Sequence, residues 1–182
     1  SPQVENMCIL RYLDKIDDST ASTMLRMFTD QHLYYVAQSR ETNFRYDDLS
    51  GVWSSPHPWR YISRLFQPGN QAALDRIRAE RPILHLVTHF MLTVSTPLFA
   101  ALGDRLRIVE VVRHPLYMLK KQFLLMPRFG TDVRNFTVWW QHGDRTLPWF
   151  CYGWAEKYSD APPMDQAIYM IEYNFRHSTV LG

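Results

Sequence analysis

Apolar and polar positions recur along the chain in segments of two kinds, one helical and one strand-like. A helix is predicted over residues 22–38, where five apolar side chains recur on one face: Met24, Leu25, Phe28, Leu33 and Val36. The same periodicity predicts helices over residues 70–80, 115–126 and 164–177. The last of these carries four apolar residues on one side: Met164, Ile168, Ile171 and Phe175.

Three apolar runs, residues 6–13, 81–89 and 107–114, have the pattern of buried strands. A helix-like connection over residues 90–104 joins the second run to the third. Strand, helix, strand and helix at this spacing predict a parallel βαβ unit with both faces of the sheet covered. The expected fold class is therefore α/β, a parallel sheet flanked by helices, within a single domain that spans residues 1–182.

Two segments do not fit this alternation. Residues 50–61 are rich in turn-forming and aromatic residues and are predicted to be a loop, with Trp53 and Trp59 as stacking candidates. Residues 127–163 are predicted to be irregular and aromatic, with Trp139 and Trp140 as further candidates. Any one of these tryptophans could equally pack in the core.

Composition limits the classes of protein that this chain represents. A chain of 182 residues with 46% hydrophobic and 21% charged residues can bury one core, with room for a small second subdomain. The net charge of only +2 argues against binding to nucleic acid or to an anionic membrane. No apolar run approaches the roughly 20 residues that a transmembrane helix needs.

The two cysteines, Cys8 and Cys151, lack the spacing of metal ligands, and free thiols are favoured over a disulfide. No cluster of His, Cys and Asp residues indicates a metal site, so no metal is expected. The sequence contains no signal-peptide pattern. A chain that begins at Ser1 is expected to be a processed form or a fragment, and the compartment stays open, with the cytoplasm slightly favoured.

Candidate chemistry lies where the three predicted strands end, because open parallel sheets bind ligands at the carboxyl ends of their strands. The first end is followed by four hydroxyl side chains at a helix N-terminus: Ser19, Thr20, Ser22 and Thr23. Backbone N–H groups and the helix dipole favour an anion at such a place. The alternative is an ordinary helix cap followed by polar residues.

The second strand ends at His89, which can accept a proton from a hydroxyl group because a histidine has a pKa of about 6.5. The alternative is a core histidine bonded to the backbone. The third strand ends at Arg113, whose planar guanidinium suits a phosphate, and Lys120 or Lys121 could lie near it across the next helix. The alternatives are a salt bridge for Arg113 and a solvated helix face for the lysines, which we prefer for Lys120.

Three segments together resemble the sulfotransferase family, whose members use 3′-phosphoadenosine 5′-phosphosulfate as the sulfonate donor. They are "STASTMLRM" (residues 19–27), "THFMLT" (88–93) and "VEVVRHPLYMLKKQ" (109–122). The resemblance implies a P-loop-NTPase-like sulfotransferase fold, in truncated form if the chain is a fragment. It also implies a nucleotide-binding core over about residues 6–122 and an aromatic-rich C-terminal part over 127–182.

The resemblance also assigns roles. It implies that His89 is the catalytic base that deprotonates an acceptor hydroxyl. It further implies that the donor, a co-substrate, is bound by seven residues: Ser19, Thr20, Ala21, Ser22 and Thr23 at the 5′-phosphosulfate, and Arg113 and Lys121 at the 3′-phosphate. The expected partner is therefore a small molecule, carbohydrate or lipid that offers a hydroxyl group. The acceptor's identity and the oligomeric state stay open.

The first segment departs from the family pattern. Ser19 stands where the family usually has Lys or Arg, and Ala21 stands where it usually has Gly. Asp17 and Asp18 precede the segment and would repel the donor if they pointed toward it. These departures leave a second hypothesis, a non-catalytic sulfotransferase-like module for binding or interaction. A P-loop kinase is disfavoured, because the chain has no G-x-x-x-x-G-K-S/T motif.

Overall fold

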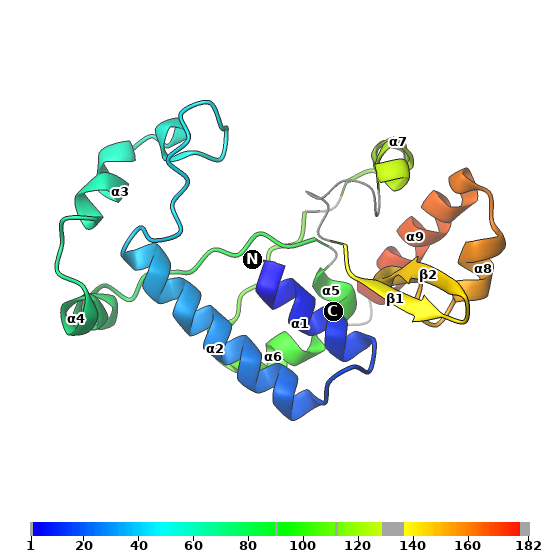
Figure 1. Cartoon of the computed structure of the whole chain (residues 1–182), viewed down its shortest axis with the longest axis horizontal. Helices are drawn as coiled ribbons and strands as arrows, with labels where there is room; N and C mark the ends of the chain where they lie inside the picture. The colour runs from blue at the N-terminus through cyan, green and yellow to red at the C-terminus, as the bar shows by residue number, and fades with distance from the viewer. Residues whose placement is uncertain (1, 90, 112, 129–136, 179–182) are drawn as a thin grey trace. The chain divides into compact units, whose positions relative to one another are not determined.

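The computed structural model describes residues 2–89, 91–111, 113–128 and 137–178 (Figure 1). Within these residues the fold is 62% helical, and its only sheet is a pair of antiparallel strands, β1 (Trp139–His142) and β2 (Arg145–Pro148). The predicted α/β fold with a parallel sheet flanked by helices is therefore wrong. The chain forms two compact units, Ser1–Leu25 with Thr88–Gly182 (unit 1) and Arg26–Val87 (unit 2).

The first predicted strand is the helix α1 (Pro2–Tyr12). Its buried side chains include Val4 and Cys8, which are four residues apart, and Leu13 is buried just beyond the helix end. A spacing of four places side chains on one face of a helix, whereas a strand would place residues two apart on one face. The apolar residues of this run fit either a strand or a helix, and the polar residues between them favour the helix.

The predicted helix over residues 22–38 is confirmed as α2 (Asp18–Ala37), which begins four residues earlier than expected. The early start follows from Asp17, whose carboxylate accepts hydrogen bonds from the backbone N–H of Thr20 (2.8 Å) and from its hydroxyl (3.0 Å). A carboxylate in this position caps a helix N-terminus. Ala21 and Leu25, one turn apart on this helix, are both fully buried in unit 1.

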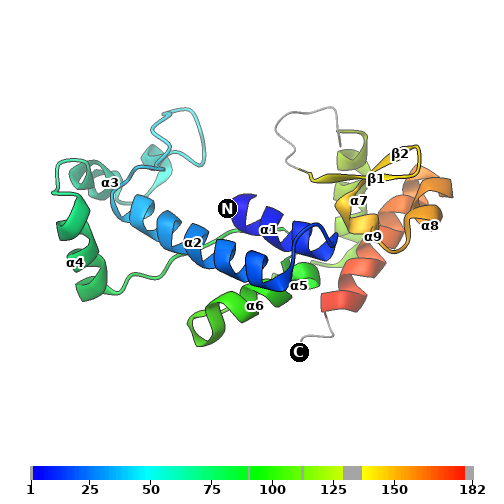
Figure 2. The same cartoon turned by 60° about the horizontal axis from the view of Figure 1, so that its bottom comes forward.

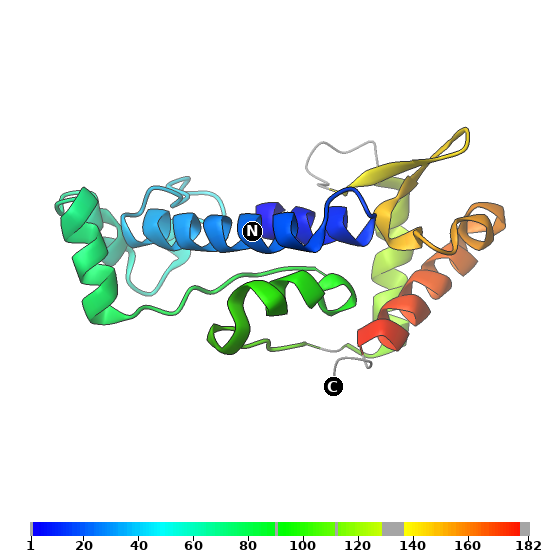
Figure 3. The same ribbon diagram turned by 90° about the horizontal axis from the view of Figure 1, so that it is seen from below.

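Unit 1 is organised around α9 (Pro163–Ser178), which lies against α7 (Pro115–Leu125), α5 (Met91–Val94) and α8 (Ala155–Asp160). The helix α1 lies against α5 and α6 (Thr96–Leu102) in the same unit (Figures 2 and 3). Short 3₁₀ turns join these helices: η2 (Gly103–Arg105), η3 (Met126–Arg128) and η4 (Trp149–Cys151). No helix in the described part of the chain is long and apolar enough to cross a membrane.

The predicted helices over residues 115–126 and 164–177 are confirmed as α7 and α9, and Pro115 stands in the first turn of α7. The buried face of α9 shares Ile171 with the side that its apolar residues indicated, but is otherwise different. Ala167, Met170, Ile171 and Asn174 are buried, whereas Met164 and Ile168 are exposed. Asn174 is held there because its side chain donates to the carbonyl of Met170 (2.9 Å).

The second and third predicted strands are extended but unpaired. Residues 82–88 and 106–111 form no ladder with any other described segment, and Ile83 and Val109 are 95% and 88% exposed. An apolar, β-branched run favours an extended backbone, but a strand also needs a partner, and the partner depends on tertiary structure. Phe90 and Val112, which the prediction placed in this region, lie outside the described residues.

The segment predicted to be irregular contains a hairpin and a helix. In the hairpin of β1 and β2, Trp139 pairs with Pro148 and His142 pairs with Arg145, and Gly143 has the positive φ of 57° that its tight turn requires. The hairpin leads into η4, whose aromatic residues are buried, and then into α8. Aromatic packing, rather than periodicity, therefore orders this part of unit 1.

Unit 2 contains η1 (Val52–Ser54), α3 (Pro58–Arg64) and α4 (Asn70–Glu80). The helix predicted over residues 70–80 is confirmed as α4, and the predicted loop over residues 50–61 holds η1 and the start of α3. Polar bonds close the loop before η1. The Asp48 carboxylate accepts from the Asn43 amide (2.8 Å) and from the Ser50 backbone N–H (2.8 Å).

Replacing Gly51 with alanine should destabilise unit 2. An added Cβ would lie 2.8 Å from the carbonyl oxygen of Asp48 and still closer to that of Arg45, so backbone would have to move. We expect the free energy of unfolding to fall by about 1–3 kcal/mol, measured by urea unfolding followed by circular dichroism. Gly69→Ala is the control, because its Cβ would approach no backbone atom and would meet only the side-chain oxygen of Gln38 (3.1 Å). Equal losses in the two variants would contradict the close approach at Gly51.

Both cysteines should be inert in the folded protein. Cys8 and Cys151 are free and fully buried, and burial raises the pKa of the Cys8 thiol to about 12 and that of Cys151 to about 11. Because the thiolate is the reactive form, we expect negligible reaction with Ellman's reagent at about pH 8. In concentrated urea both thiols should react at once. Reaction of either thiol within minutes in the native protein would contradict this burial.

Candidate functional site

The segment Ser19–Thr23 forms the first turns of α2 rather than a loop around an anion. Ser19, Thr20 and Thr23 are exposed, while Ala21 points into the core and is fully buried. The Asp17 carboxylate accepts hydrogen bonds from the backbone N–H and the hydroxyl of Thr20. The first of these, from the backbone N–H, lowers the pKa of Asp17. A negative charge therefore occupies the helix N-terminus, where the sequence predicted a bound phosphosulfate. As folded, this segment does not fit an anion.

The arginine beside this turn, Arg11, is bound to carboxylates. Arg11 pairs with Asp18 (Nε to Oδ1, 2.5 Å) and with Asp14 (Nη1 to Oδ1, 2.8 Å). The hydrogen bond from Arg11 lowers the pKa of Asp18, so that carboxylate stays ionised at neutral pH. Arg11 thus offsets the charge of its own carboxylate partners and does not replace the cation that the family pattern has at Ser19.

His89 lies just before α5 and pairs with Glu5 of α1. The backbone N–H of His89 donates to Glu5 Oε1 (3.1 Å), and His89 Nδ1 lies 3.7 Å from Glu5 Oε2. The imidazole is 77% exposed, whereas the Glu5 side chain is only 18% exposed. The carboxylate therefore faces one ring nitrogen from inside the fold. Among the described residues, the other nitrogen, Nε2, has no hydrogen-bond partner, so it is open to a ligand.

Opposing influences act on His89. The Glu5 carboxylate beside the ring raises the pKa of the imidazole, whereas partial desolvation and the positive charge of Lys121 on α7 lower it; the net result is a raised pKa. Lys121 and His89 both belong to unit 1. The structure thus joins His89 to Glu5 of α1, and the charge of Lys121, from another of the three segments that the sequence analysis singled out, acts on the same imidazole.

Arg113 stands immediately before α7 and is exposed. It forms no ion pair with a carboxylate in the described part of the chain, so its guanidinium is available to an anion. Its neighbour His114 caps α7, because the His114 Nδ1 accepts from the backbone N–H of Leu116 (3.3 Å). Lys121 lies about 9 Å further along the helix axis than Pro115. Lys121 is therefore on the second turn of α7, whereas Arg113 precedes the helix.

No hydrogen bond or ion pair between described residues links the Ser19–Thr23 turn to His89 or to Arg113. The described residues also include no group of three or more His, Cys, Asp or Glu placed to hold a metal ion. Of the tryptophans considered as stacking platforms, Trp140 is bound within the hairpin, where its Nε1 donates to the carbonyl of Pro148 (3.2 Å). Trp53 and Trp59 are exposed in unit 2 and meet edge to face at 6.4 Å.

The sequence analysis missed Glu5. Because the run 6–13 was interpreted as a strand, the residue before it was not considered as part of an element. The spacing of Val4 and Cys8 is the signal that could have placed Glu5 on a helix, one turn before a buried position. Its proximity to His89, 84 residues away, depends on the tertiary structure and has no signal in the sequence.

Comparisons of the chain with protein-family models, with curated proteins and with solved structures found no match. The resemblance to sulfotransferases therefore stays a prediction carried by three short segments.

Proposed function

We propose that the chain transfers a sulfonate group from 3′-phosphoadenosine 5′-phosphosulfate to the hydroxyl group of an acceptor, with His89 as the general base. The observation that carries this proposal is the Glu5–His89 pair. A carboxylate near Nδ1 orients an imidazole and stabilises its protonated form, and the exposed Nε2 is then free to accept a proton. The acceptor class is a small molecule, a carbohydrate or a lipid with a free hydroxyl.

The reaction needs one proton acceptor and positive charge near the donor. Neutral His89 takes the hydroxyl proton as the acceptor oxygen bonds to sulfur. The bond between sulfur and the bridging oxygen breaks, and 3′,5′-adenosine bisphosphate leaves with the electron pair. Glu5 stabilises the imidazolium that forms. Arg113 and Lys121 are the cations proposed for the donor's 3′-phosphate, and both side chains are exposed.

A second candidate, a non-catalytic binding module, is favoured by one observation at α2. The Asp17 carboxylate occupies the N-terminus where the donor's 5′-phosphosulfate would bind, and Ala21 points inward. In this arrangement the chain lacks a cradle for the transferred group. The two candidates therefore differ in whether the nucleotide binds at all.

Calorimetric titration with 3′,5′-adenosine bisphosphate tests the nucleotide site. We expect micromolar binding, about −8 kcal/mol, that weakens by about tenfold or more in Arg113→Ala and in Lys121→Met, because each variant removes a charge-assisted contact with phosphate. Lys120→Met, which changes the neighbouring exposed lysine, is the matched control and should bind like the wild type. Failure of the wild type to bind would reject sulfonate transfer and leave the non-catalytic module.

The charges around His89 predict the direction of its titration in two variants. Glu5→Gln should lower the pKa of His89, since it removes the carboxylate that raises this pKa, and Lys121→Met should raise it. The measurement is an NMR titration of the histidine Cε1–H signals, with His89→Gln to assign the signal. Because the base must be neutral, the acidic limb of turnover should move to lower pH in Glu5→Gln and to higher pH in Lys121→Met.

The same pair links stability to pH. The raised pKa of folded His89 means that its stabilisation is fully present below the pKa of an unfolded histidine, about 6.5, and is lost as the pH rises through the higher folded value.

An unchanged His89 titration in Glu5→Gln would show that Glu5 does not position the base.

A further inference from the structure

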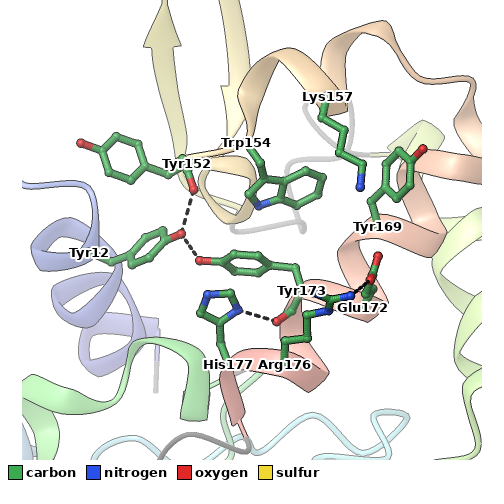
Figure 4. A pocket seen from close by; sticks show the side chains of 10 residues that line it. Tyr12, Tyr152, Trp154, Lys157, Tyr169, Glu172, Tyr173, Arg176 and His177 are labelled. Carbon is green, nitrogen blue, oxygen red and sulfur yellow. Dashed lines mark hydrogen bonds and ion pairs between the residues drawn. The ribbon is translucent and has the colours of Figure 1, made fainter.

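A cavity of about 560 Å³ lies in unit 1, apart from every residue assigned to sulfonate transfer (Figure 4). It is bounded by the end of α1, the turn that precedes α8, α8 itself and α9. Aromatic side chains form most of its wall: Tyr12, Tyr152, Trp154, Tyr169 and Tyr173. Pockets of about 300–1,000 Å³ with such a lining are typical of sites for small molecules.

The rings are held in fixed positions. The Trp154 and Tyr173 rings lie 5.6 Å apart at 31°, and the Tyr173 and His177 rings lie 3.9 Å apart, also at 31°. The indole Nε1 of Trp154 donates to the carbonyl of Phe150 (2.9 Å), and this bond fixes the plane of the ring. A planar ligand would therefore meet aromatic side chains that are already ordered, so little conformational entropy is lost on binding.

The phenol groups on the α1 side of the cavity are neutral and already bonded. The Tyr12 hydroxyl donates to the carbonyl of Tyr152 (2.9 Å) and is hydrogen-bonded to the Tyr173 hydroxyl. Burial is the main cause that raises the pKa of Tyr12 and that of Tyr173, so both keep their protons at neutral pH. This side of the cavity offers a ligand aromatic surface and no charge.

The opposite side carries a lysine. The Lys157 ammonium lies 3.8 Å from the centre of the Tyr169 ring and reaches down between that ring and Trp154 (Figure 4). Among the described residues it has no carboxylate partner. The other two charges at the cavity offset each other, because Arg176 donates to Glu172 (2.5 Å). Lys157 is thus the unbalanced charge, which repels a cation and attracts an anion.

We propose that this cavity binds a planar aromatic anion, one or two fused rings that bear a carboxylate or a sulfonate. The ring packs against Trp154 and the other aromatic side chains that line the cavity, and the anionic group pairs with Lys157. A cage of tyrosines and a tryptophan alone would suit a cation. Here Lys157 already occupies the face of Tyr169 with its own ammonium, and so the cavity selects the opposite charge.

The probes are 2-naphthoate and 2-naphthylmethanol, a neutral compound of nearly the same shape, each titrated calorimetrically into the full chain. We expect 2-naphthoate to bind at least about tenfold more tightly than the alcohol, because only the anion pairs with Lys157. Lys157→Met should weaken 2-naphthoate by about the same factor and leave the alcohol unchanged. Lys120→Met is the control, since Lys120 does not line the cavity, and Trp154→Leu should weaken both probes.

Lys157 is exposed, so Lys157→Met should fold, and circular dichroism checks this for each variant. Equal affinity of the wild type for the two probes, or an unchanged affinity of Lys157→Met for 2-naphthoate, would overturn the charge selection. Absence of 2-naphthoate binding at millimolar concentration would overturn the site. None of these outcomes depends on the sulfonate donor, and so the test is independent of the proposed function.

Discussion

The burial of one face of α9 holds unit 1 together, and the other features of that unit depend on it. Ala167, Met170 and Ile171 form this face, and it packs against α5 and α7. Asn174 adds a polar link, since its Oδ1 accepts from the Thr93 hydroxyl of α5 (3.1 Å), four residues beyond His89. The other side of the same helix carries Tyr169 and Tyr173 to the aromatic cavity. One packed helix thus connects the segment of the proposed base to the cavity wall.

Helical periodicity could be predicted because it is a local property. The helices α2, α4, α7 and α9 each repeat their pattern over 11 to 20 residues, and all four were found where the sequence placed them. The short apolar runs were ambiguous. Residues 6–13 fit either a strand or one face of α1, and the runs around Ile83 and Val109 favour an extended backbone without specifying a neighbour. The predicted parallel sheet was wrong because it required strands to pair with one another, and the local pattern of a segment does not specify its pairing partner.

The residues of the candidate site stay predictions. His89 was identified at the end of an apolar run and Lys121 on the helix after the next run, and in the structure the charge of Lys121 acts on His89 although no sheet edge joins them. Glu5 and the aromatic cavity could not be predicted, because each is assembled from residues far apart in the chain. Tyr12 and Tyr173 are 161 residues apart, and only the packing of α1 near α9 joins them. A site that is assembled by such long-range contacts leaves no periodic pattern in the sequence.

The conflict between the α2 terminus and a bound donor can be weighed by energy. Loss of an N-terminal cap costs about 1 kcal/mol, whereas micromolar binding of a nucleotide supplies about 8 kcal/mol. The cap at Asp17 is therefore too weak by itself to exclude the donor. The charge of Asp17 is the stronger obstacle, because Arg11 is bound to Asp14 and Asp18 and does not neutralise it. The proposed donor binding would therefore require Asp17 to turn away from the helix end and free the backbone N–H of Thr20, and the attraction would come from Arg113 and Lys121, the cations proposed for the 3′-phosphate.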